Sequence, residues 1–206
     1  HASGMLDLDF TNIGCDFYAA SGHKWQCGPG GTGIFYVSKD APTLWPILSS
    51  VYEFTGRSDI GLALQYHGNP NYPAMQALVD SCNFWDTIGR KRIEDRVLEL
   101  SSHCKQEIQK AFPKAHLYCP NIPEISSGLT TFNPFKNVYS KEKVKNFRDA
   151  LRERHKFIIR YTHFKANDWD TQDTYALRIS THIFNDKQQI NNLIHAMVDV
   201  FQTLSL

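Results

Sequence analysis

The chain has 206 residues, of which 42% are hydrophobic and 13% aromatic, so it is long enough to bury a core as one domain or as two small ones. Its 22 basic and 21 acidic residues give a formal charge of +1, and no basic face or nucleic-acid-binding motif accompanies this balance. No apolar run approaches the roughly 18 residues of a membrane span. We therefore expect neither nucleic acid nor a membrane as a partner.

The cysteines indicate a reducing compartment. They are five in number and form no CxxC pair, and they stand at Cys15, Cys27, Cys82, Cys104 and Cys119. Reduced thiols and a cytoplasmic location are the plain interpretation. The first residues, HASGMLDLDF, lack an initiator Met and begin in mid-pattern, so we expect an upstream segment, which could have carried a targeting signal.

Two short strands are predicted near the start of the chain. CDFYAASG (15–22) and TGIFYV (32–37) are rich in aromatic and β-branched residues and are bounded by glycine. The loop between them holds Lys24 and the run GPGGTG (28–33). This run is neither a P-loop nor a GxGxxG that opens a helix. It is equally consistent with a tight connection between strands and with close approach of backbone to a ligand.

A long helix is predicted from about Pro73 to Phe112. Apolar residues recur at spacings of three and four, and Arg, Lys and Glu fill the other face. Because a helix of this length commonly links two domains, we place the boundary on it. The expected organisation is a first domain over residues 1–76, a linking helix over 77–112 and a small α+β domain over 113–206.

The small domain is predicted to pack helices on one face of a sheet. A helix opens at Ser140, and the last helix opens at Asn185 with Gln188 in the capping-box position. NDWDTQDT (167–174) is polar and is expected to be a loop. The expected strands are KAHLYC, SGLTTFNPF, KFIIRYT and YALRIST.

Lys24 is the candidate catalytic residue. Most lysines are solvated surface charges. Lys24 differs because it closes a strand, has no acidic neighbour in sequence and is followed by glycines. An amine in a partly desolvated crevice has a lowered pKa and can attack an aldehyde to form a Schiff base, which is the chemistry of pyridoxal phosphate. Ser21 and His23 offer donors for a phosphate, although His23 could instead contact a strand end.

A metal site is not expected. Although the chain has nine histidines, His155, His163 and His182 lie on different predicted elements and no His-x3-His or Cys-x2-Cys spacing occurs.

The segment DFYAASGHKWQCGPGGTGIFYV resembles the lysine segment of the class V aminotransferases, which are fold-type I pyridoxal phosphate enzymes. Its Trp and nearby Gly-Pro resemble the isopenicillin N epimerase-like branch. Other segments match in the same order: HASGMLDLDF, YHGNPNYPAMQAL, SSGLTTF and LRISTHIFND. The resemblance implies a partial fold-type I α/β structure: the end of the large cofactor-binding domain, a linking helix and a small α+β C-terminal domain.

The resemblance also implies roles for individual residues. Lys24 would bind the cofactor and move the α-proton, while Ser21 and His23 would contact its phosphate. His1 would bond the phenolic oxygen. By the same resemblance, Gly68 and Asn69 would contact the cofactor phosphate of the neighbouring subunit. Arg178 would bind the substrate carboxylate. Asn stands where the family has Thr. A homodimer with a shared site is implied, and an aspartate three residues before His1.

The reaction type stays open. The interval from Phe157 to Arg178 contains no cysteine, which argues against persulfide-forming desulfuration. Epimerisation by removal and return of the α-proton is the preferred hypothesis. Transamination and β-elimination at a C–S bond are the alternatives, and an inactive fold that serves in dimerisation or binding is the alternative from another class.

Overall fold

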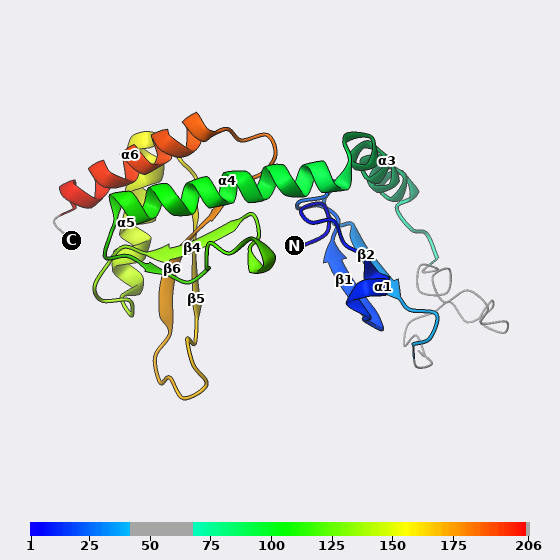
Figure 1. The fold of residues 1–206 in the computed structure, drawn as a ribbon, viewed down its shortest axis with the longest axis horizontal. Helices are drawn as coiled ribbons and strands as arrows, with labels where there is room; N and C mark the ends of the chain where they lie inside the picture. Colours follow the sequence, from blue (N-terminus) through cyan, green and yellow to red (C-terminus); the bar gives the residue numbers. More distant parts are fainter. Residues whose placement is uncertain (42–67, 205–206) are drawn as a thin grey trace. The chain divides into compact units, whose positions relative to one another are not determined.

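The structure is a computed structural model that describes residues 1–41 and 68–204. The chain divides into two compact units, His1–Ile93 and Glu94–Leu206, and each is described by itself (Figure 1). Tyr66 and His67, which begin the predicted segment YHGNPNYPAMQAL, lie outside the described residues.

The first unit contains a two-stranded antiparallel sheet. β1 (Phe17–Ser21) pairs with β2 (Gly33–Val37) over their full length. The short helix α1 (Phe10–Ile13) precedes them, and its Phe10 ring stacks on Tyr36 at 4.5 Å between centroids. Both strands expected around the Lys24 loop are therefore confirmed.

The prediction of a single long helix from about Pro73 to Phe112 is wrong, because the structure has two helices over these residues. α3 (Tyr72–Ile88) ends at Gly89, and α4 (Arg90–Ala111) begins directly after it. Gly89 has φ +98°, a conformation open to glycine and strained for other residues. Since the apolar spacing is helical on both sides of Gly89, periodicity does not reveal the break. The division between the two units falls within α4; the assignment of 1–76, 77–112 and 113–206 to domains stays a prediction.

The second unit is a four-stranded antiparallel sheet with helices. Its strands lie in the order β3-β4-β6-β5, and the helix α5 connects β4 to β5. A 3-10 turn, η1 (Pro123–Ile125), lies between β3 and β4. The bounds are β3 (His116–Leu117), β4 (Leu129–Asn133), α5 (Lys141–His155), β5 (Arg160–Phe164), β6 (Thr174–Ser180) and α6 (Lys187–Thr203).

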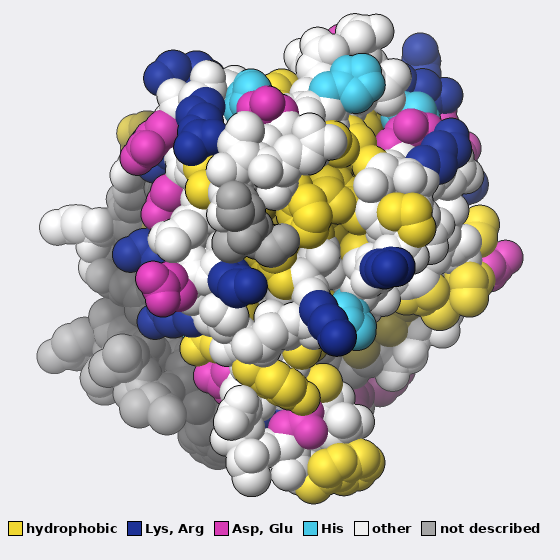
Figure 2. Space-filling view, turned by 90° about the vertical axis from the view of Figure 1, so that its left-hand side faces the viewer, with side chains coloured by type: hydrophobic (Ala, Val, Ile, Leu, Met, Phe, Trp, Pro, Cys, Tyr) yellow, Lys and Arg dark blue, Asp and Glu magenta, His cyan; other side chains and the backbone are white. Residues whose placement is uncertain are grey.

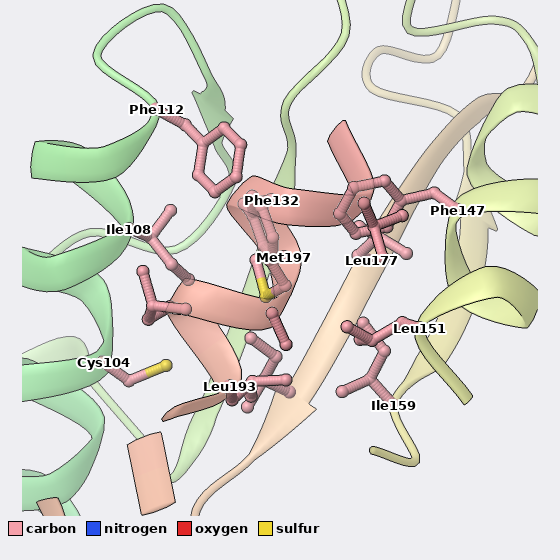
Figure 3. Close-up of a cluster of buried hydrophobic side chains, with 14 of the residues drawn as sticks. Cys104, Ile108, Phe112, Phe132, Phe147, Leu151, Ile159, Leu177, Leu193 and Met197 are labelled. Atoms are coloured by element: carbon pink, nitrogen blue, oxygen red, sulfur yellow. The ribbon is translucent and has the colours of Figure 1, made fainter. Parts of the chain in front are cut away.

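One face of this sheet packs against the helices, as Figure 3 shows. Phe132 of β4 and Leu177 of β6 are fully buried among side chains of all three helices. Burial of each such side chain contributes about 1.5–3 kcal/mol. The helices contribute Cys104 and Ile108 (α4), Phe147 and Leu151 (α5), and Leu193 and Met197 (α6). The α+β arrangement with helices on one sheet face is thus confirmed.

Element starts are confirmed at one place and corrected at two. Ser140 caps α5 as predicted, accepting from Lys143 N at 3.3 Å. α6 is capped by Asp186 with Gln189, not by Asn185 with Gln188, because the Asn185 amide oxygen accepts from His182 N instead. β5 begins at Arg160 and not at Lys156, since Lys156 has φ +63° and ends α5.

The loop expected over 167–174 connects β5 and β6, with Thr174 already in the strand. KAHLYC yields only the two residues of β3. Within residues 1–41 and 68–204, no helix is long and apolar enough to cross a membrane.

Candidate functional site

Lys24 lies in a closed turn that we call the lysine turn, residues Gly22–Gly28. Gly28 N donates to Gly22 O at 2.8 Å and closes it, and Cys27 N donates to Lys24 O at 3.0 Å within it. Gly22 N also donates to Thr32 O at 3.0 Å, directly before the start of β2. The turn is therefore fixed by backbone bonds that are independent of its side chains.

Two glycines let the lysine turn pack against α3. A Cβ on Gly28 would lie 2.6 Å from Leu78 Cδ1 and 2.9 Å from Gly22 O. A Cβ on Gly22 would lie 2.8 Å from Thr32 Oγ1 and 2.9 Å from Leu78 Cδ1. All four distances are shorter than those of real Cβ contacts, so a Cβ at either position would displace its neighbours. At Gly28 one of these neighbours is a backbone atom, which makes the substitution more costly there than at Gly22, whose close contacts are the ends of side chains.

The two residues after Lys24 anchor the turn. Trp25 and Gln26 are buried. The Gln26 side chain accepts from Arg90 Nη1 at 2.9 Å and donates to Ser81 O at 3.4 Å, and the Ser81 hydroxyl donates to Gln26 O. This network holds the turn to α3 and to the start of α4. No local sequence pattern marks Gln26 or Arg90 as part of this network, because the partners are 55–64 residues apart in the chain.

Lys24 itself is exposed, and its amine has no hydrogen bond or ion pair with the part of the chain that the structure describes. The expected partly desolvated crevice is thus not what surrounds it in this unit. Trp25 and Gln26 take the inward positions, and this leaves Lys24 pointing outward. The amine is held on a rigid turn and is open to a ligand.

His23 contacts a strand end, as the alternative interpretation held. Its Nδ1 lies 3.2 Å from Thr32 O. Because a carbonyl oxygen only accepts, Nδ1 carries the hydrogen, and Nε2 is left for a ligand. Nε2 donates to a phosphate only when the ring is doubly protonated. Ser21, the last residue of β1, is half-buried opposite Gly33.

The segment that begins with His1 lies against the lysine turn. Gly4 has φ +80°, and a Cβ there would be 2.3 Å from Gln26 N. Gly4 O accepts from the buried Trp85 Nε1 at 2.8 Å, and Ser3 N donates to Tyr18 Oη at 3.1 Å. His1 is exposed three residues from this contact. The glycine of the HASG motif is visible in the sequence, but its close approach to the backbone of Gln26 depends on the tertiary structure.

Gly68 and Asn69 are exposed and lie just before α3. Gly68 has φ +81°. Asn71 caps the helix, and its side-chain oxygen accepts from Ala74 N at 3.1 Å. This leaves the amide of Asn69 with no role in capping.

Arg178 lies on β6, on the sheet face opposite Leu177. It stands across from Thr131 on β4 and from Arg160 on β5. Its Nε is buried and has no hydrogen-bond partner among the described residues. A buried guanidinium N–H without an acceptor is costly, and a bound carboxylate would satisfy it. The structure thus brings Ser21, His23 and Lys24 together in the first unit and places Arg178 in the second.

Residues 2–193 match the family described as Aminotransferase class-V. The chain belongs to this family. The class V match covers the lysine turn, the Gly68–Asn69 segment and Arg178 alike, which confirms the resemblance given by the motifs.

Two curated relatives are isopenicillin N epimerases. The one from Streptomyces clavuligerus is 28% identical over 96% of this chain and 50% of its own length, and the one from Amycolatopsis lactamdurans is 24% identical over 97% and 50%. A cysteine desulfurase from Wigglesworthia glossinidia brevipalpis is 26% identical over 95% of this chain and 47% of its own. The chain therefore spans about half the length of these relatives.

Solved structures show the same fold. A C-DES K223A mutant with glycine covalently linked to its pyridoxal phosphate cofactor has a TM-score of 0.71 at 21% identity, covering 97% of this chain and 50% of that one. A NifS-like protein has a TM-score of 0.68 at 16% identity, with the same coverage. These structural neighbours confirm a partial fold-type I structure.

Pyridoxal phosphate is the cofactor typical of this class V family. The residues of the first unit fit it: an exposed amine on a fixed turn, a neighbouring hydroxyl at Ser21, and a ring nitrogen of His23 left for a phosphate. Within the described ranges, no cluster of His, Cys, Asp or Glu could hold a metal ion instead.

Proposed function

We propose that the protein is a pyridoxal-phosphate-dependent enzyme that acts at the α-carbon of an amino acid, by removal and return of the α-proton as in an isopenicillin N epimerase-like reaction. The observation that carries the proposal is the lysine turn, whose backbone and neighbouring side chains are fixed while the Lys24 amine is exposed. Two epimerase relatives over 96–97% of this chain support the preference for epimerisation.

When bound, the cofactor would supply an electron sink that makes the α-proton acidic. Lys24 would hold the cofactor through its amine, and the same amine would take and return the proton at the α-carbon. The bonds that fix Gly22, Cys27 and Gly28 limit where Nζ can reach, which favours a defined geometry for proton transfer.

The remaining residues bind and orient. Ser21 and His23 contact the phosphate from the lysine turn, and His1 bonds the phenolic oxygen. The Asn69 amide, after Gly68, donates to the phosphate of a neighbouring subunit in a homodimer. Arg178 binds the substrate carboxylate through two parallel N–H···O bonds, and its unpartnered Nε supports this role.

A second candidate is elimination at a C–S bond, which a relative named as a putative L-cysteine desulfhydrase, 28% identical over 50% of this chain, favours. Because no cysteine occurs between Phe157 and Arg178, we propose a reaction without a protein-bound persulfide. Transamination is the third possibility and would require a keto-acid acceptor.

The experiment is amino-acid turnover in deuterium oxide with the protein in the form that the cell makes. Epimerisation predicts deuterium at the α-carbon of recovered amino acid of both configurations. Elimination instead releases a keto acid and sulfide, and transamination proceeds only with an added keto acid. If borohydride treatment with the cofactor leaves Lys24 unmodified in peptide mapping, the whole proposal is wrong and the inactive-fold alternative stands.

A further inference from the structure

A cavity of about 1080 Å³ opens at the end of the second unit where α4 and α6 finish and α5 begins. Its floor is aromatic. The ring of Phe201 lies 5.5 Å from that of Phe112 and 5.7 Å from that of Phe135, measured between centroids. Phe112 and Phe135 are buried parts of the core, so this floor is rigid and already formed.

The rim of the cavity is positively charged. Lys114, Lys136 and Lys143 line it together with His116, and its lining contains no Asp or Glu. Among the residues that the structure describes, none of these three ammonium groups forms an ion pair or a hydrogen bond. Figure 2 views this end of the unit and shows hydrophobic side chains in a hollow with Lys and Arg side chains around it.

Charge and shape together define the ligand class. Unpaired cations around a low-dielectric floor concentrate a positive potential, which attracts an anion. The aromatic floor offers contact to an apolar body, and small-molecule sites combine an apolar lining with a few polar groups in volumes of about 300–1,000 Å³. We propose that this cavity binds a small amphipathic anion, with an aromatic or aliphatic body and a carboxylate, phosphate or sulfonate group.

This site is separate from the proposed cofactor chemistry. All of its lining residues lie between Ala111 and Gln202, and Arg178 is not one of them. The proposal therefore stands or falls independently of Lys24.

The test compares two fluorescent probes that share a ring system, measured with the full chain. The probe 1-anilinonaphthalene-8-sulfonate is anionic, whereas N-phenyl-1-naphthylamine lacks the sulfonate. We expect saturable sulfonate binding that weakens with added salt, and much weaker binding of the neutral amine. Equal affinity for both probes would overturn the anion requirement.

Variants locate the binding. Replacing any one of Lys114, Lys136 and Lys143 by Gln is expected to weaken sulfonate binding about fivefold, the upper end for an exposed ion pair. Lys145→Gln is the matched control, because Lys145 is exposed on α5 and does not line the cavity. Gln202→Trp fills the exposed rim without changing charge and is expected to abolish binding. If sulfonate affinity is unchanged in the rim variants and in Gln202→Trp, the proposal is wrong.

Discussion

Arg160 and Arg178 stand directly opposite each other across the β5–β6 pair, on the sheet face that points away from the helices. Like charges in facing positions of antiparallel strands repel. Neither arginine has an ion-pair partner in the described part of the chain. The pair is thus destabilising unless an anion lies between or beside the two guanidinium groups.

The first prediction concerns this pair. Arg178→Gln should leave the free energy of unfolding unchanged or raise it by about 0.2–1 kcal/mol, because the repulsion is removed. It should also lower kcat/KM at least about 30-fold, since a buried bond to the substrate carboxylate is lost. Urea unfolding and steady-state kinetics check the two effects. Arg160→Gln should change the unfolding free energy by the same amount as Arg178→Gln and lower kcat/KM less. A marked loss of unfolding free energy in either variant would contradict repulsion between the two arginines.

The second prediction separates the chemistry of Lys24 from folding. Lys24→Ala should change unfolding free energy by less than about 0.5 kcal/mol, because the side chain is exposed and makes no bond to the described residues. It should lower kcat at least about 100-fold through loss of the acid–base group. Lys39→Ala, also exposed, is the control and should be neutral in both. Full turnover by Lys24→Ala would refute the assigned role.

The third prediction tests the packing of the lysine turn. Gly28→Ala should destabilise the chain by about 1–3 kcal/mol, because the new Cβ meets Leu78 and the Gly22 carbonyl. Gly30→Ala should be near neutral, since a Cβ there meets nothing within 4 Å. Thermal unfolding measures both. Combining Gly28→Ala with Leu78→Ala should cost less than the sum of the single changes; strict additivity would mean that the two positions do not touch.

The fourth prediction distinguishes the observed cap of α6 from the predicted one. Gln189→Ala should cost about 1 kcal/mol, because the Gln189 side chain accepts from Asp186 N at the helix start. Gln188→Ala should cost a few tenths at most, since Gln188 bonds only the exposed Asn192 amide one turn on. Chemical unfolding measures the loss of unfolding free energy in both variants. A larger loss for Gln188→Ala than for Gln189→Ala would favour Asn185 as the cap of α6.

The fifth prediction follows from burial of Cys104, which raises the pKa of its thiol from 9.0 to about 12. In the folded state the thiol keeps its proton across this range, whereas in the unfolded state it loses it above 9.0. The folded state therefore binds more protons, and stability falls as pH rises from 9 towards 12. Unfolding free energy measured against pH should show a shallower fall in Cys104→Ala than in the unaltered chain. Cys15→Ala, a partly exposed thiol in the other unit, should keep the full slope.

The local sequence pattern predicts an element correctly where the residues that determine the element lie within one short segment. The glycine-bounded aromatic runs on either side of Lys24 form β1 and β2, and Ser140 caps α5, as predicted. Turn and cap preferences act within a few residues, so the sequence shows them directly. The break at Gly89 was missed since one glycine in a periodic pattern is compatible with a continuous helix.

Tertiary contacts decided what pattern could not. The pattern of the predicted helix places its Arg, Lys and Glu residues on a polar face, yet the structure buries Lys105, and its Nζ donates to Pro120 O and Ser126 Oγ at 3.1 Å each. That burial depends on a loop 15–21 residues away covering α4. Likewise, Arg178 was a candidate from its motif, but its position opposite Arg160 required the strand register.

The bond from Trp85 to Gly4, which spans 81 residues, has a consequence for how fast the first unit assembles. Closing a loop of that length costs chain entropy before any contact is gained, and chains dominated by such distant pairings fold slowly. The β5–β6 hairpin of the second unit closes across a short loop and has no comparable delay. Newly made chains should therefore form the β5–β6 hairpin early, and the contact between Gly4 and Trp85 should form late.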